Sequence, residues 1–138
     1  MKNRTIIISD QDHRRLAALI ESARYDASLS GDDLVALEGE LKRARVVPPS
    51  RVPSEVITMN SVVRLRDLDT EELEEYELVY PADADMAHNR ISVLAPIGTA
   101  ILGYRPGDVI EWLVPAGPRR LRVEEVLYQP ERAGTLQL

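Results

Sequence analysis

Three aspartates, Asp26, Asp32 and Asp33, surround a break between two predicted helices and form the acidic group best placed to do chemistry. Carboxylate oxygens are ligands that Mg²⁺ takes in proteins, where the ion also keeps several waters, so two such residues can help to hold it. The alternative is structural, because acids near the start of a helix interact favourably with its positive end. Asp32 and Asp33 fit both interpretations.

The other residue types argue against most enzymatic chemistry. The two histidines, His13 and His88, have no partner at metal-ligand spacing and are expected at the surface. No serine lies in a G-x-S-x-G turn, no glycine-rich phosphate loop is present, and there is no cysteine. We therefore expect a protein that is not an enzyme and that holds neither a metal nor a cofactor.

The composition is that of a soluble globular protein, with 44% hydrophobic and 29% charged residues among 138. A net charge of −6 argues against a protein that grips nucleic-acid phosphates, and the absence of phenylalanine argues against a base-stacking platform. The charge suits a partner protein with a basic surface, although solubility alone explains it equally well. No apolar run approaches the ~20 residues of a membrane span, and no signal-peptide pattern opens the chain. We expect a cytoplasmic monomer.

The N-terminal part predicts a short antiparallel helical hairpin over residues 11–45. Thr5–Ile8 is an extended apolar segment, and Ser9–Asp12 resembles a capping box that starts a helix. Apolar residues mark one face of each helix, and the second helix has coiled-coil-like spacing: Leu16, Leu19, Ile20 and Ala23, then Leu34, Leu37, Leu41 and Ala44. Three prolines within residues 46–53 predict a stiff linker. We divide the chain into a hairpin segment (1–47), a linker (48–54) and a sheet domain (55–138).

The C-terminal part predicts an α+β domain made of four or five antiparallel strands and one short helix. Alternating apolar residues place strands at residues 57–67, 75–80, 91–93, 109–114 and 119–128. Pro96 should start the helix, whose apolar face is Ile97, Ala100 and Ile101, and Gly103 should end it. The tail after Pro130 is expected to be mobile.

Four ordered segments carry a resemblance to a known family. They are ITMNSVVRLRDL (57–68), LVYPADAD (78–85), ISVLAPIGTAILGYRPGDVIEW (91–112) and EVLYQPE (125–131). Together they resemble the C-terminal domain of the Gre-type transcription factors. The match extends over most of the chain, the opening Thr5–Ile8 included, and most resembles the short Rnk-type members of this family, named as regulators of nucleoside diphosphate kinase. The resemblance implies an FKBP-like fold for this domain.

The resemblance also implies a binding site for RNA polymerase at the rim of its secondary channel. Gre proteins dock through an S-P-I-G unit, which reads Ala95-Pro96-Ile97-Gly98 here, with alanine in place of the usual serine. The residues expected to take part are Asp83, Asp85, Ser92, Ala95, Pro96 and Ile97. Pro96 and Ile97 would form an apolar anchor, and the two aspartates would meet basic side chains. Alternatively, Pro96 and Ile97 only start a helix and fill the core.

Three functions stay open. The first is a polymerase-binding protein that competes with Gre-type factors without cleaving RNA, because the hairpin is too short to carry Asp32 and Asp33 to the active centre. The second is a Mg²⁺-dependent cleavage factor that acts through those acids. The third is a regulator of nucleoside diphosphate kinase that acts through another protein. An FKBP-like fold also suggests prolyl isomerase activity. This activity is disfavoured because the domain offers only Trp112 and four tyrosines for an aromatic pocket.

Overall fold

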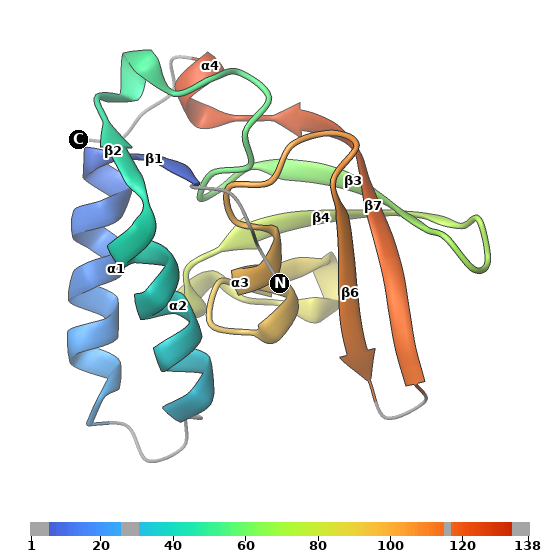
Figure 1. Ribbon diagram of the computed structural model, residues 1–138, viewed down its shortest axis with the longest axis horizontal. Coiled ribbons are helices and arrows are strands. Elements are labelled where there is room, and N and C mark those ends of the chain that lie inside the picture. Colours follow the sequence, from blue (N-terminus) through green and yellow to red (C-terminus); the bar gives the residue numbers. More distant parts are fainter. Residues whose placement is uncertain (1–5, 26–30, 115–116, 134–138) are drawn as a thin grey trace.

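In the computed structural model, residues 6–25, 31–114 and 117–133 are described, and they form two helices beside a curled sheet (Figure 1). Helices α1 (Asp10–Ala23) and α2 (Gly31–Arg43) lie side by side, which confirms the predicted helical pair. Strand β1 (Ile7–Ser9) precedes α1, and strand β2 (Arg45–Val47) follows α2. These strands pair in parallel, with Ile8 opposite Val46, so a small sheet joins the two ends of the hairpin.

The helices form where the apolar pattern predicted them. Ser9 is the N-cap of α1, and its hydroxyl accepts a hydrogen bond from the Asp12 N–H at 3.0 Å. Leu16 and Ile20 of α1 and Leu37 of α2 are buried, as the stripes require. Among the described residues no helix is long and apolar enough to cross a membrane.

The larger sheet has five strands in the order β5-β4-β3-β7-β6. Their bounds are Val62–Asp67 (β3), Leu73–Val79 (β4), Arg90–Ser92 (β5), Val109–Val114 (β6) and Gly117–Tyr128 (β7). Three of the pairings are antiparallel, but β4 and β5 are parallel. The sheet is therefore mixed, which corrects the antiparallel expectation. The connection from β4 to β5 carries two short 3₁₀ helices, η2 (Pro81–Asp83) and η3 (Met86–His88), and lets the chain return before β5 starts.

The first strand of the larger sheet is shorter than predicted. Residues 57–61 form a turn, in which the Ser61 N–H donates to the Thr58 carbonyl oxygen at 3.1 Å and the Ser61 hydroxyl accepts from the Thr58 N–H at 2.9 Å. Asn60 has a φ of 65°, which is incompatible with a strand. The strand begins at Val62, and Val63 and Leu65 point into the core as predicted.

Helix α3 (Pro96–Ile101) forms as the proline and glycine signals predicted. Pro96 lies in its first turn, and Gly103 beyond its end has a φ of +84°. The start of the tail predicted to be mobile forms helix α4 (Pro130–Ala133), and the rest of this tail lies outside the described residues. Buried Gln129 fixes the start of α4 by donating from Nε2 to the carbonyl oxygens of Pro53, at 2.8 Å, and Val56, at 2.7 Å.

One hydrophobic core runs through both halves of the chain. Its buried residues include Ile6 and Ile8 beside β1, Leu16 and Leu37 of the helices, and Ile101 of α3. The predicted linker (48–54) directly follows β2, and Pro49–Arg51 within it forms a 3₁₀ helix, η1, that contacts α4. The division into two domains stays a prediction, but the core does not stop at it.

Candidate functional site

The segment that joins β5 to α3 is a tight turn fixed by its own backbone. The Ala95 N–H donates to the Ser92 carbonyl oxygen at 3.0 Å, and Thr99 Oγ1 donates to the Val93 carbonyl oxygen at 2.6 Å. Gly98 is required here, because a Cβ atom at this position would lie 2.1 Å from the Ser92 oxygen. The turn is thus preorganised by the fold.

The residues predicted to bind polymerase in this turn differ in their exposure. Pro96 is exposed, and Ser92 and Ala95 are half-buried. The Ser92 hydroxyl already accepts a hydrogen bond from the Leu94 N–H at 3.0 Å. Ile97 is only 4% exposed and packs in the core, so Pro96 is the member of the predicted apolar pair that a partner can reach.

The two predicted acidic residues lie on the connection before β5. Asp83 is exposed at the end of η2. Asp85 is more constrained, because its carboxylate accepts hydrogen bonds from the Ala87 N–H at 3.1 Å and lies 2.6 Å from Nδ1 of His88. The Asp85 N–H also donates to the Arg90 carbonyl oxygen at 3.0 Å, and the Arg90 N–H donates to the Asp85 carbonyl oxygen at 2.9 Å. Asp83 is therefore the freer carboxylate for a partner.

The side chains of the predicted acidic hairpin tip lie outside the described part of the structure. Asp26 lies outside the described residues, and so do the side chains of Asp32 and Asp33, although their backbone starts α2. The described part of the chain contains no group of three or more histidine, aspartate or glutamate side chains that can hold a metal ion. His13 instead approaches the Leu41 carbonyl oxygen, 3.4 Å from its Nε2.

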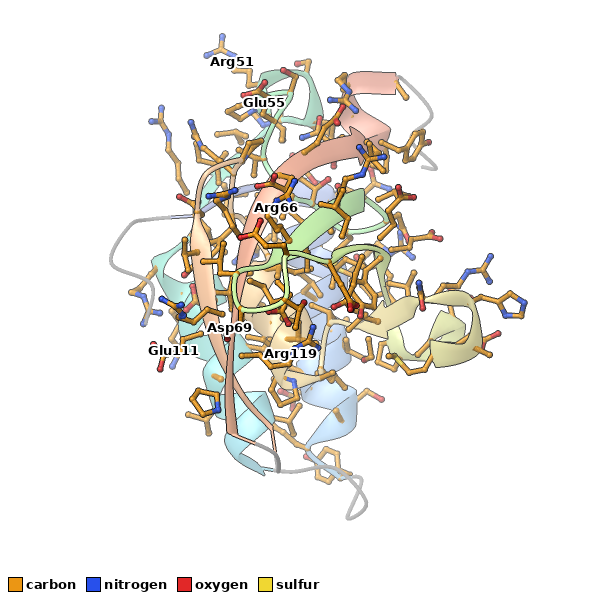
Figure 2. The ribbon with its side chains drawn as sticks, turned by 90° about the vertical axis from the view of Figure 1, so that its right-hand side faces the viewer. Arg51, Glu55, Arg66, Asp69, Glu111 and Arg119 are labelled. Atoms are coloured by element: carbon orange, nitrogen blue, oxygen red, sulfur yellow. The ribbon has the colours of Figure 1, made fainter. Side chains whose placement is uncertain are left out.

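The outer face of the sheet carries arginines that are paired with carboxylates. The ion pairs on this face include Arg66–Glu124 at 2.9 Å and Arg120–Asp69 at 3.1 Å. Arg119 and Asp67, paired at 3.0 Å, lie at the end of the sheet on the face that carries the buried Leu121. Figure 2 looks onto this side of the molecule and shows Arg66, Asp69 and Arg119 in front of the helices. Because these positive charges are balanced locally, the face offers little free charge to nucleic-acid phosphates.

A pocket of about 350 Å³ lies where α1, β4, the end of β7 and α4 meet. Its polar lining includes Asp12, Arg15, Tyr80, Asp83 and Glu131. Asp83 thus belongs both to this pocket and to the predicted binding loop. Sequence reasoning missed the pocket, because its walls come from both ends of the chain and from the middle.

Asp12 is the unusual residue of this pocket. Only 7% of its surface is exposed, its Oδ1 accepts a long hydrogen bond of 3.5 Å from the Tyr80 hydroxyl, and its Oδ2 is buried without a hydrogen-bond partner in the described structure. Burial, followed by the nearby charge of Glu131, raises the pKa of Asp12 to about 7 against weaker opposing contributions from the Met59 N–H and Arg15. The capping pattern was the only sequence signal at this position.

The groups around Asp12 have partners of their own. The guanidinium of Arg15 lies over the ring of Tyr80, 4.4 Å from its centroid. Glu131 accepts a hydrogen bond of 2.7 Å from Thr58 Oγ1. Burial, followed by the charge of Asp12, raises the pKa of the Tyr80 hydroxyl, which therefore stays a hydrogen-bond donor.

Comparisons with known proteins agree across the whole chain. Residues 52–128 match the family model described as transcription elongation factor GreA/GreB, C-terminal part, and residues 4–47 match the Rnk N-terminus. The chain is 43% identical over 135 residues to the regulator of nucleoside diphosphate kinase of Escherichia coli K12, with 97% of each chain covered. It is 36% identical over 103 residues to transcription elongation factor GreA of Clostridium kluyveri, which covers 75% of this chain and 65% of the relative.

A solved structure of similar fold supports these matches. The GreA/GreB transcription elongation factor from Nitrosomonas europaea superposes with a TM-score of 0.79 at 45% identity, covering 90% of this chain and all of the other. The observed architecture, with N-terminal helices beside a curled sheet, is therefore the GreA/GreB-like fold.

Proposed function

Because the chain belongs to the GreA/GreB family of transcription elongation factors and begins with an Rnk-type N-terminal region, we propose that it binds RNA polymerase. We place the contact at the rim of the secondary channel, where it competes with Gre-type factors without promoting RNA cleavage. The loops around Asp83 and Pro96 form the contact surface.

One observation carries this proposal: the turn between β5 and α3 presents an exposed proline, and the connection before β5 presents an exposed carboxylate. Pro96 and Asp83 are both accessible, while Ile97 and Gly98 anchor the turn from beneath. A preorganised loop loses little conformational freedom on binding, and a rim carboxylate favours a basic partner. The buried Ile97 thus has the supporting role, and Pro96 makes the apolar contact.

The size of the helical pair favours binding without cleavage. Helix α1 has 14 residues and α2 has 13, so at 1.5 Å per residue the longer one reaches about 21 Å. We infer that Asp32 and Asp33 stay short of the catalytic centre. Mg²⁺-dependent shortening of transcripts in stalled complexes, abolished by Asp33→Ala, would contradict this and favour the cleavage alternative.

The test is equilibrium binding to core RNA polymerase, with and without an excess of a Gre-type factor. Pro96→Asp should weaken binding at least about tenfold, because it places a charge at the centre of the contact, whereas Val109→Asp, at another exposed apolar position, should not. Asp83→Lys should weaken binding several-fold, and the matched charge reversal Glu55→Lys, placed near η1 in Figure 2, should weaken it less. Failure of the wild-type chain to bind, or binding unaffected by the Gre-type factor, would refute the proposal.

The name of the Escherichia coli relative supports a second candidate, regulation of nucleoside diphosphate kinase. In this alternative the chain acts through another protein partner. Binding to purified nucleoside diphosphate kinase, or a kinase level that depends on the chain while polymerase binding is absent, would favour it.

A further inference from the structure

The pocket between α1 and α4 has more negative charge than its own residues balance. The charged and titratable groups that face it, from every element packed around it, are Asp12, Arg15, Glu77, Tyr80, Asp83, Tyr128 and Glu131. Glu77 is offset by Arg90, at 3.5 Å, and Arg15 is the single cation among the described residues of the lining. Three carboxylates, Asp12, Asp83 and Glu131, therefore share one arginine.

Arg15 does not neutralise Asp12 directly. Its guanidinium lies over the Tyr80 ring, and no ion pair joins it to Asp12 among the described residues. The Oδ2 atom of Asp12 is left without a partner, although 93% of the residue's surface is buried. A buried polar atom without a partner is costly, so a fixed oxygen of this kind marks a place where a donor is missing.

The chemistry of the walls limits what can supply that donor. An anion would be repelled by the carboxylates, and a neutral apolar group would leave Oδ2 unsatisfied. A metal ion is disfavoured, because the described residues contain no group of three suitable ligands. An ammonium or guanidinium group fits, since it donates several hydrogen bonds and also packs against an aromatic ring, as Arg15 already does on Tyr80.

We infer that this pocket receives a lysine or arginine side chain of the protein partner, with the carboxylates of Asp12 and Glu131 as its ligands. The inference rests on the proposed function, because Asp83 lies in both the pocket and the predicted polymerase-binding loop. A pocket of about 350 Å³ has room for one such side chain. The terminal torsion of aspartate is broad, so a rotation of the Asp12 carboxylate presents either oxygen to the incoming group.

The ionisation of Asp12 should make the affinity for the partner depend on pH. In the free chain its pKa is about 7, so it is mostly neutral at pH 6 and mostly ionised at pH 8. A cation that enters the pocket binds the ionised form, and binding below pH 7 therefore releases a proton. The linkage predicts that affinity rises about tenfold from pH 6 to pH 8.

The experiment measures the affinity for core RNA polymerase at pH 6, 7 and 8. Asp12→Asn should abolish the extra tenfold dependence and weaken binding at pH 8, whereas the matched control Asp10→Asn, on the exposed start of the same helix, should keep the dependence. Glu131→Gln should weaken binding at each pH, and its amide oxygen can still accept the hydrogen bond from Thr58. This variant provides the test if Asp12→Asn does not fold. Equal curves for the wild type, Asp12→Asn and Glu131→Gln would overturn the inference and leave the proposed function standing.

A second measurement does not depend on the polymerase. The Asp12 carboxyl carbon is followed by NMR in the full chain while methylguanidinium is added as a small cationic probe. We expect the pKa of Asp12 to fall as the probe binds, and to fall less in Glu131→Gln. If polymerase binding fails but this shift occurs, the proposed function is refuted and the pocket chemistry is supported. If methylguanidinium changes the Asp12 resonance no more than the same concentration of sodium does, the pocket inference is refuted.

Discussion

Asp12 and Asp67 are buried almost equally, with 7% and 6% of their surfaces exposed, but their carboxyl groups have opposite environments. Asp67, at the end of β3, accepts hydrogen bonds from the backbone N–H groups of Asp69, at 2.8 Å, and Thr70, at 3.2 Å, and from the Arg119 guanidinium. These two N–H groups, followed by Arg119, hold the pKa of Asp67 below its usual range. Asp12 accepts a long bond from Tyr80 at 3.5 Å, and burial raises its pKa against a weaker opposing contribution from the Met59 N–H.

The comparison shows that two carboxyl groups with similar exposed fractions can have pKa values shifted in opposite directions. Hydrogen-bond donors outweigh desolvation at Asp67, whereas desolvation is the largest effect at Asp12. Asp67 is satisfied within the chain and stabilises the connection between β3 and β4. Asp12 has room for a donor that the described residues do not supply. A buried acid of the second kind is a better indicator of a binding site than the more numerous exposed acids.

The largest expected effect is the pH dependence of stability in Asp12→Asn. The folded-state pKa of about 7 exceeds the ordinary aspartate pKa of 3.8, so the contribution of Asp12 to stability is complete only below pH 3.8 and is lost as the pH rises through 7. The difference in the free energy of unfolding, Asp12→Asn minus wild type, should therefore increase by at most about 4 kcal/mol between pH 4 and pH 8. Urea denaturation across this range measures it, and parallel curves would show that Asp12 does not differ from an ordinary surface aspartate.

Asp67→Asn should act in the opposite direction. Because the pKa of Asp67 is lowered, its contribution to stability is present above its unfolded-state pKa and is lost as the pH falls through the folded value. At pH 7 the variant loses the charged acceptor for Arg119, and Tm should fall by about 4 °C. Thermal denaturation at pH 7 and pH 3 checks this, with a smaller difference expected at pH 3.

Glu131→Gln should make Asp12 more like Asp67. Removal of the negative charge of Glu131 takes away a contribution that raises the pKa of Asp12, so this pKa should fall by less than about one unit. The NMR titration of the Asp12 carboxyl carbon measures the change. An unchanged titration would mean that desolvation alone sets the pKa.

Arg15→Gln should give the smallest change, with the reverse sign. Arg15 favours the ionised form of Asp12, so its removal should raise the pKa of Asp12 slightly. The effect is small because the exposed guanidinium lies over the Tyr80 ring. The same titration measures it, and a fall in the pKa of Asp12 would contradict the assigned charges.

The sequence predicted the features that local patterns determine. Helix periodicity placed Leu16 and Leu37 in the core, and Pro96 and Gly103 correctly bounded α3. The pairing of β1 with β2 and the parallel register of β5 were missed, because three-residue strands leave too short a pattern to detect.

The candidate site was predicted less completely. Local motifs selected Asp83 and Pro96, which are exposed, but they could not show that Ile97 is buried. The pocket could not be found from spacing, because Asp12 and Glu131 are separated by most of the chain and meet only in the folded molecule. A charge at a helix start looks the same whether it faces solvent or the interior.

The position of Ile6 in the core limits the order in which the chain can fold during synthesis. Its side chain fills the space beside Gly103, where an added Cβ would lie 2.4 Å from that of Ile6. The ribosome makes this isoleucine long before the glycine that receives it. Ile6 therefore cannot pack in its final position until Gly103 has been synthesised, and the base of the helical pair should become rigid only after that point.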